Sequence, residues 1–272
     1  MKFSVIVVCL NPGAKLKTTI DSILGQTFRD FEVIIKDGGS TDGSVEPWKG
    51  CAEYIEGTVR FFQEKDRGIY DAMNQAVAHA AGEYILFLNC GDKFPDERVL
   101  ERTAAVIDAQ MEAVADCERL VLYGDTYSEK NDVTISAPPS ITGFTCFRNI
   151  PCHQSCFYSI SLCREKPYDL EFRIRADYDH FLWCFYRAGA KFVHMGFSVA
   201  SYEGGGYSES RENRTLDRQE HRLITHSYMG KAELFCYRAI MACTLAPLRT
   251  ALAESRVFSG VYQWVKSKVY RR

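Results

Sequence analysis

Four apolar runs in the first hundred residues of the chain are each followed by a polar side chain, either directly or within a few residues. These residues are Asn11, Asp37, Asp66 and Asp92. In an open sheet of parallel strands, the carboxyl ends of the strands meet at one edge, and ligands bind in the crevice there. We therefore expect these side chains to form one polar edge that reads a ligand and holds a cation.

The most informative stretch of this edge runs from Asp37 to Gly43, with the sequence DGGSTDG directly after an apolar run. An acidic side chain at the end of a buried strand, before a glycine-rich turn, is typical of a ligand-reading group. A helix-capping turn is one alternative, but it explains Asp42 better than Asp37. A calcium loop is another, but its twelfth position is Trp48 where glutamate is required.

Asp92 follows the apolar run 85–88 and Asn89, so it is predicted to lie at a strand end. A carboxylate there can bind a hard divalent cation, Mg²⁺ or Mn²⁺. The acidic cluster is thin, because Asn89, Cys90 and Gly91 precede a single aspartate. The alternative is that Asp92 only starts a turn with Lys93.

The elements that must position these residues alternate between strand and helix. The predicted strands are short apolar or β-branched runs over 3–9, 31–35, 59–63 and 84–88. Helical spacing of apolar residues predicts helices over 15–24 and 69–80, with Gly82 ending the second. This alternation predicts an α/β fold with a mainly parallel central sheet and helices on both faces.

A second section, 116–226, contains predicted strands at 120–123 and 192–200 and a helix at 178–188. A final helical section starts at Lys231 and breaks near Pro247. From Lys231 onward there are 8 Lys/Arg and 2 Asp/Glu, so the tail is basic, whereas the rest of the chain has 25 basic and 33 acidic residues.

Composition narrows the class of protein. With 272 residues, 46% apolar and 25% charged, the chain reads as one principal globular domain. Its 11 cysteines are an odd number without a C-x-x-C pair, which favours reduced thiols and argues against a structural zinc. The first apolar run is too short for a signal sequence, so we expect a cytoplasmic protein. An acidic body argues against nucleic-acid binding.

Five segments, in this order and spacing, resemble family 2 glycosyltransferases with the GT-A fold. They are 4–11, 37–43, 64–74 (EKDRGIYDAMN), 82–92 and 175–179 (RADYD), and the resemblance covers about residues 1–205. It is closest to the colanic-acid-type branch of bacterial exopolysaccharide biosynthesis, because GIYDAMN, FLNxGD and His153-Gln154 occur together.

The resemblance implies an inverting glycosyltransferase of the hexosyltransferase class, with the GT-A fold and C-terminal helices. It would move a sugar from a nucleotide-diphosphate donor, with UDP favoured, to a lipid-linked glycan acceptor in surface polysaccharide biosynthesis. We accordingly divide the chain into a nucleotide-sugar-binding half (1–115), an acceptor-binding half (116–226) and a basic amphipathic helical tail (227–272).

Two further alternatives remain open at this point. A sugar nucleotidyltransferase uses a similar sheet, but the chain lacks a glycine-rich Arg/Lys signature near the first strand. A non-catalytic sugar-nucleotide-binding protein is the other, because the acidic cluster before Asp92 is thin.

Asp177 matches the catalytic aspartate of the family, which acts as the general base on the acceptor hydroxyl. Asp179 lies two residues further, and side chains two apart on a helix do not share a face. Only one of the two is therefore expected to point at the acceptor. The alternative for Asp177 is helix N-capping.

The resemblance also assigns the remaining contacts. Asp37 would accept from the imide N–H of uracil, and Asn11, Asp66, Arg67, Asn89 and Gly91 would contact the nucleotide sugar. Asp66 and Arg67 precede a helix start, which suits phosphate contacts, although Arg67 is equally explained as a solvated charge. His153 and Gln154 are acceptor-side candidates, with a buried structural histidine as the alternative.

The basic tail combines apolar residues with Lys and Arg, as in helices that lie on an anionic membrane. We expect peripheral contact with the inner face of the cell membrane, where a lipid-linked acceptor would lie. A helix packed on the body with a solvated end is the alternative.

Overall fold

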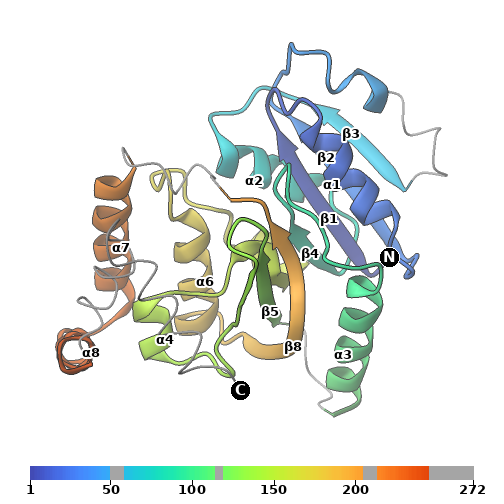
Figure 1. Cartoon of the computed structure of the whole chain (residues 1–272). Helices are drawn as coiled ribbons and strands as arrows, with labels where there is room; N and C mark the ends of the chain where they lie inside the picture. The colour runs from blue at the N-terminus through green and yellow to red at the C-terminus, as the bar shows by residue number, and fades with distance from the viewer. Residues whose placement is uncertain (50–57, 114–118, 205–212, 245–272) are drawn as a thin grey trace. The chain divides into compact units, whose positions relative to one another are not determined.

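The computed structural model describes residues 1–49, 58–113, 119–204 and 213–244. Its centre is one eight-stranded sheet (Figure 1). In chain order the strands are β1 (Phe3–Cys9), β2 (Phe31–Asp37), β3 (Val59–Gln63), β4 (Tyr84–Phe87), β5 (Leu120–Ser128), β6 (Val133–Ile135), β7 (Cys156–Ser159) and β8 (Lys191–Tyr202). Across the sheet they follow the order β3-β2-β1-β4-β7-β5-β6, and β8 pairs with β5.

Helices and short 3₁₀ turns connect these strands. They are α1 (Lys15–Leu24), η1 (Glu46–Trp48), α2 (Ile69–His79), α3 (Val99–Ala113), α4 (Gly143–Arg148), η3 (His153–Ser155), α5 (Ile160–Glu165), α6 (Ala176–Tyr186), α7 (Arg214–Tyr228) and α8 (Lys231–Cys243). The predicted strands at 3–9 and 59–63 and the helix at 15–24 have the expected bounds. Helix α3 and strand β7 had not been predicted.

The N-terminal part of the sheet is parallel throughout. Strand β1 lies between β2 and β4, and β3 follows β2 at the edge. The register pairs Cys9 with Asp37 and Asp37 with Gln63, so these three strands end level with one another. Every residue of β2 is buried, as expected for a strand covered on both faces. Because β1, β2 and β3 end at the same height, the loops that follow them lie at one edge of the sheet.

The C-terminal part of the sheet changes direction at β7. This strand is antiparallel to both β4 and β5, whereas β8 is parallel to β5. The sheet is therefore mixed, with four parallel and three antiparallel pairings. The expected α/β architecture of the GT-A type is confirmed: a central sheet between helices, with C-terminal helices after it (Figure 1).

Gly82 allows the chain to approach β1 closely. A Cβ atom at this position would lie 2.5 Å from the backbone carbon of Phe3 and 2.7 Å from the Ser4 hydroxyl oxygen. The Gly82 N–H donates to that hydroxyl at 2.8 Å, and the hydroxyl donates to Glu32 at 2.6 Å. Helix α2 ends at His79 with Ala80 as its C-cap, so Gly82 serves the entry into β4 and does not end the helix, as its position had suggested.

Two compact units divide the chain, Met1–Ile224 and Thr225–Arg272. The sheet and α1 to α6 belong to the first unit, together with most of α7. Within the described residues, no helix is long and apolar enough to cross a membrane. Helix α8 confirms a helical section after Lys231, while the predicted break near Pro247 lies outside the described residues.

Candidate active site

The loops after β1 and β2 are joined by hydrogen bonds. Asn11 has a φ of 50°, in the left-handed region that asparagine tolerates. Its N–H donates to the Ser40 hydroxyl at 2.7 Å, and its side-chain oxygen accepts from the Thr41 N–H at 2.8 Å. Asp42 accepts from the Gly13 N–H at 3.0 Å. Asn11 and Asp42 therefore fix the glycine-rich loop against the start of α1.

Asp37 is enclosed by this loop. Its carboxylate accepts from the N–H groups of Gly39 (3.1 Å) and Ser40 (2.9 Å), from the Ser40 hydroxyl, and from Gln63 Nε2 at 2.7 Å. Burial raises its pKa, but the hydrogen bonds from Ser40, Gln63 and Gly39 outweigh it, so the pKa lies below its usual range. The side chain has an exposed fraction of 0%. The Asp37 carboxylate is thus held by the loop and by Gln63.

Asp66 lies beside this loop and retains some exposure. Its Oδ2 pairs with the ammonium of Lys36 at 3.0 Å, with side-chain exposed fractions of 0% for Lys36 and 12% for Asp66. A Cβ atom at Gly38 would lie 2.7 Å from the same Oδ2. Glycine at position 38 is therefore what leaves room for the Asp66 carboxylate.

Arg67 is largely exposed to solvent. Its side chain is 79% exposed and pairs with Asp71 at 3.3 Å. The Arg67 N–H donates to the same carboxylate at 2.9 Å. The guanidinium extends from the start of α2 into solvent, and the Asp71 carboxylate satisfies the backbone at this helix start.

Asp92 is buried in the loop that follows β4, with an exposed fraction of 6%. Its Oδ1 accepts from the Glu203 N–H at 3.0 Å. Burial raises the pKa of Asp92, and the Glu203 N–H, the Gln154 side chain and the charge of His153 oppose that rise only in part. Thr19 fixes the backbone here, because its hydroxyl donates to the Asp92 carbonyl and accepts from the Gly91 N–H.

A divalent cation fits the donors around Asp92. The side-chain oxygen of Asn89 is buried and has no hydrogen-bond partner in the described part of the chain. A carboxylate and an amide oxygen are the hard ligands that Mg²⁺ and Mn²⁺ prefer. Over the same residues, no three Asp, Glu, His or Cys side chains gather into a metal-holding group. Most ligands would therefore have to come from phosphates and water.

Asp177 is the second residue of α6, and the N-cap position belongs to Arg175. The N-capping alternative for Asp177 is therefore wrong. Its Oδ1 lies 2.9 Å from the Tyr70 hydroxyl, and its Oδ2 lies 3.3 Å from His153 Nδ1. Burial raises the pKa of Asp177, but these two partners and the Tyr178 N–H more than offset it, so the pKa lies below its usual range. Its side chain keeps 19% exposure.

His153 interacts with both Asp177 and Asp92. It contacts the former through Nδ1, and its charge lowers the pKa of the latter, while its Nε2 is buried without a partner among the described residues. The neighbouring Gln154 accepts from the Asn89 N–H at 2.7 Å and hydrogen-bonds to the Asp92 carboxylate. Turn η3 thus joins the strand end of β4 to the start of α6.

Asp179 points elsewhere. It is 5% exposed and its carboxylate pairs with Lys166. Asp177 and Asp179 thus make different contacts, in keeping with their spacing.

Tyr70 belongs to this constellation although its side chain was not singled out in the sequence. Its hydroxyl contacts both Asp177 and the carbonyl of Ile174, the latter at 2.5 Å. The only signal in the sequence was its place in the GIYDAMN segment, where an aromatic residue at helical spacing is read as core.

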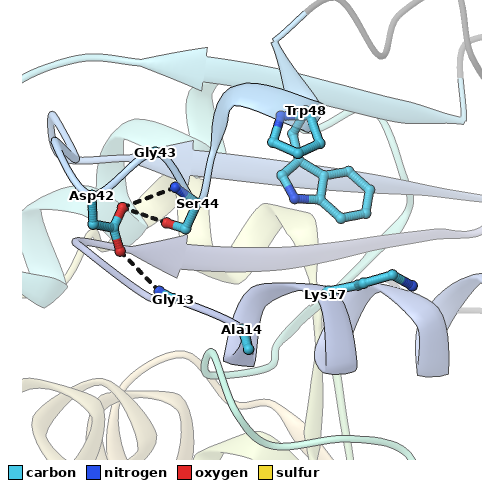
Figure 2. A pocket seen from close by; sticks show the side chains of 8 residues that line it. Gly13, Ala14, Lys17, Asp42, Gly43, Ser44 and Trp48 are labelled. Carbon is cyan, nitrogen blue, oxygen red and sulfur yellow. Dashed lines mark hydrogen bonds between the residues drawn. The ribbon is translucent and has the colours of Figure 1, made fainter.

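A separate cavity of about 790 Å³ lies between the start of α1 and the loop that leads to η1. Figure 2 shows the indole of Trp48 on one side and the ammonium of Lys17 on the other, with Asp42 bonded to Gly13 and Ser44. Asp66, Asp92 and Asp177 are not among its lining residues. This cavity is therefore distinct from the constellation around His153.

The chain is similar in sequence to known glycosyltransferases. Residues 4–163 match the model of the family described as "Glycosyl transferase family 2". A "PGL/p-HBAD biosynthesis glycosyltransferase" of Mycobacterium bovis is 34% identical over 210 residues, which cover 76% of this chain and 79% of that protein. An "uncharacterized glycosyltransferase" of Mycobacterium tuberculosis is 32% identical over 254 residues, covering 87% and 93%.

Solved structures share the fold at low sequence identity. TarS of S. aureus, in complex with UDP-GlcNAc, has a TM-score of 0.63 and 18% identity; the match covers 80% of this chain and 65% of the TarS chain, less than two thirds of its length. The mannosyltransferase PcManGT of Pyrobaculum calidifontis, in complex with GDP-Man and Mn²⁺, has a TM-score of 0.63 and 17% identity, with 100% and 88% covered.

Proposed function

The chain belongs to glycosyltransferase family 2, and from this premise we propose that it transfers a sugar from a nucleotide-diphosphate donor to a glycan acceptor with inversion. One observation carries the proposal. Turn η3 contacts both carboxylates: His153 Nδ1 lies 3.3 Å from Asp177 Oδ2 at the start of α6, and the next residue, Gln154, hydrogen-bonds to Asp92 in the loop after β4. The proposed leaving-group site and the proposed base are thus linked by two consecutive residues of one turn.

For the donor, we propose a UDP-sugar bound at the edge formed by Asn11, Asp37 and Asp66. Asp37 would hold the glycine-rich loop in shape, because its carboxylate is enclosed. Asp66 keeps an exposed fraction of 12% and is oriented by Lys36. It is therefore the carboxylate at this edge that a base N–H can reach. The structural neighbours bind UDP-GlcNAc and GDP-Man, which supports a nucleotide sugar as the donor class.

For the leaving group, we propose a divalent cation held by Asp92 and the Asn89 side-chain oxygen. Such a cation supplies positive charge to the departing diphosphate. The buried side-chain oxygen of Asn89, which has no hydrogen-bond partner among the described residues, supports this assignment. The neighbour PcManGT is described with Mn²⁺.

For the acceptor, Asp177 is the general base. Its carboxylate takes the proton of the acceptor hydroxyl while the hydroxyl oxygen forms a bond to the anomeric carbon. The bond between that carbon and the phosphate oxygen breaks, and its electron pair leaves with the nucleotide diphosphate. Attack from the face opposite the leaving group inverts the configuration. Because its pKa is lowered, Asp177 is ionised and ready to accept a proton at neutral pH.

The acceptor we propose is a lipid-linked glycan in bacterial surface polysaccharide assembly of the colanic-acid type. One relative is named for PGL/p-HBAD biosynthesis, and the basic tail suits an anionic membrane surface on the cytoplasmic side. On α8, Phe235 and Ile240 are 74% and 43% exposed. Removal of residues 231–272 should release the protein from anionic liposomes while transfer to a soluble acceptor persists; unchanged liposome binding would refute the membrane contact.

The test is a screen of UDP- and GDP-sugars by thermal shift, with and without Mn²⁺, followed by donor hydrolysis and transfer to glycan acceptors. We expect one UDP-sugar to raise the melting temperature in a Mn²⁺-dependent way, because a ligand that binds only the folded state stabilises it. The same donor should then be hydrolysed. Donor binding without hydrolysis or transfer would indicate a binding protein, and pyrophosphate release from a nucleoside triphosphate would indicate a nucleotidyltransferase.

A further inference from the structure

Helix α7 contacts the loop that leads into the proposed base. The carboxylate of Glu220 accepts hydrogen bonds from three consecutive backbone N–H groups: Arg173 at 2.8 Å, Ile174 at 3.0 Å and Arg175 at 2.9 Å. Glu220 is only 3% exposed. Hydrogen bonds to an ionised acceptor are about twice as strong as neutral ones. The loop 173–175 is therefore fixed at three successive points by one side chain.

A second acidic residue of α7 reinforces this contact. Asp217 lies three residues before Glu220, so both side chains are on the same face of the helix. Its carboxylate forms a two-pronged pair with the Arg175 guanidinium, with distances of 2.7 Å to Nε and 3.0 Å to Nη2. The same guanidinium lies 5.3 Å from the ring centre of Tyr178. Arg175 is thus held by α7 through both its backbone and its side chain.

The held loop is directly connected to Asp177. Arg175 is the N-cap of α6, and Asp177 is its second residue. The carbonyl of Ile174 contacts the Tyr70 hydroxyl, which also contacts Asp177 Oδ1. A shift of the loop would therefore move both the backbone that carries Asp177 and the hydroxyl that orients its carboxylate.

We propose that Glu220 is a positioning residue for the transfer reaction, which fixes loop 173–175 and thereby the direction of the Asp177 carboxylate. The inference rests on the proposed role of Asp177 as the base. The match to the family model ends at residue 163, and helix α7 lies beyond it. The family match therefore says nothing about a role of α7 in the reaction. A displacement of about 1 Å at a reacting group costs on the order of 100-fold in rate.

The experiment compares Glu220→Gln, Asp177→Asn and the double variant in the full chain. We expect Glu220→Gln to bind the donor as the wild type does but to lose about 10- to 100-fold in kcat. If Glu220 acts only through Asp177, the double variant should be no slower than Asp177→Asn alone. Amide hydrogen exchange at residues 173–175 should become faster in Glu220→Gln.

Ile224→Val is the matched control. The substitution removes one methylene from a buried residue of the same helix, and Ile224 takes no part in the three hydrogen bonds of Glu220. The kcat should therefore stay within about twofold of the wild type, while the melting temperature falls slightly. The Glu220→Asp variant keeps the charge and should recover part of the lost kcat.

Each outcome separates the two claims. Wild-type turnover by Glu220→Gln, or a double variant slower than Asp177→Asn by the full factor, would overturn the inference alone. Wild-type turnover by Asp177→Asn would overturn the proposed base and the inference together.

Discussion

The glycine-rich loop and the region around His153 differ in how completely their polar side chains are hydrogen-bonded. In the loop, each oxygen of Asp37 accepts at least one hydrogen bond, and Asn11 and Asp42 bond to neighbouring backbone. Around His153, the Nε2 atom and the Asn89 oxygen are buried without partners among the described residues. Buried polar atoms are normally satisfied, so these two atoms can accept a partner that the protein itself does not provide.

The two regions also differ in the pKa of their carboxylates. Hydrogen bonds lower the pKa of Asp37 despite its burial, whereas burial raises the pKa of Asp92. Hydrogen bonds from the protein stabilise the ionised form of Asp37. The ionised form of Asp92 is not stabilised to the same extent, so a bound cation would stabilise it further. We therefore expect the loop around Asp37 to contribute mainly to stability and the region around His153 to contribute mainly to transfer.

The strongest test of this difference is Asp177→Asn. The substitution removes the proton acceptor and keeps the shape of the side chain, so transfer should fall by about 10²- to 10⁴-fold. Donor binding, measured by isothermal titration calorimetry, should stay unchanged. Turnover near the wild-type rate in a coupled assay for released nucleotide diphosphate would contradict the role of Asp177.

A smaller effect is expected for Asp92→Ala. Loss of this oxygen ligand should weaken Mn²⁺-dependent donor binding by about 10- to 100-fold, by analogy with perturbed metal sites. The measurement is a Mn²⁺ titration at fixed donor, with Asp96→Ala as a control because Asp96 is an exposed carboxylate on the same loop. An unchanged titration curve would show that Asp92 is not a ligand.

Asp37→Asn should act on stability instead. It replaces an acceptor by an amide that faces N–H donors, and a buried group left unsatisfied costs about 1–3 kcal/mol. At about 2–4 °C per kcal/mol for a domain of this size, the melting temperature should fall measurably. The donor affinity of Asp37→Asn, corrected for the fraction of protein that is unfolded, should change less than that of Asp92→Ala. A large loss of affinity with full stability would instead make Asp37 a direct contact.

The smallest effects are the pH dependences of these variants, and their signs are opposite. Because the pKa of Asp37 is lowered by folding, its stabilising effect is present above the unfolded pKa and is lost as the pH falls through the folded pKa. The stability gap between wild type and Asp37→Asn should therefore close in acid.

For Asp92 the pKa is raised by folding, so the ionised carboxylate costs stability at neutral pH. In chelator-treated buffer, Asp92→Asn should be slightly more stable than wild type at pH 7, and this gain should vanish as the pH falls through the folded pKa. Thermal unfolding across the pH range measures both variants. Equal signs would erase the distinction between the two regions.

The parallel part of the fold was predictable because each strand is a short apolar run with a polar end. The runs at Phe3–Cys9 and Val59–Gln63 have the predicted bounds. Strand β7 was not predictable, since its four residues, CFYS, are too few to show a period, and its direction depends on pairing with β4 and β5.

The candidate site was predictable only in part, for a physical reason. Residue types and spacing place Asp37, Asp92 and Asp177 near strand and helix ends, but they do not tell which carboxylate is already saturated. That depends on partners distant in sequence, such as Gln63 for Asp37 and Tyr70 for Asp177. Glu220 gave no signal at all, because it is one acidic residue on a charged helix.

Gly38 has a consequence for how this chain could be redesigned. Its missing side chain and the Asp66 carboxylate compete for one volume, because a Cβ at position 38 would lie 2.7 Å from Asp66 Oδ2. A side chain at position 38 would therefore displace the Asp66 carboxylate, which is the partner of the buried Lys36 ammonium. Engineering of donor preference at this edge has to vary positions 36, 38 and 66 together.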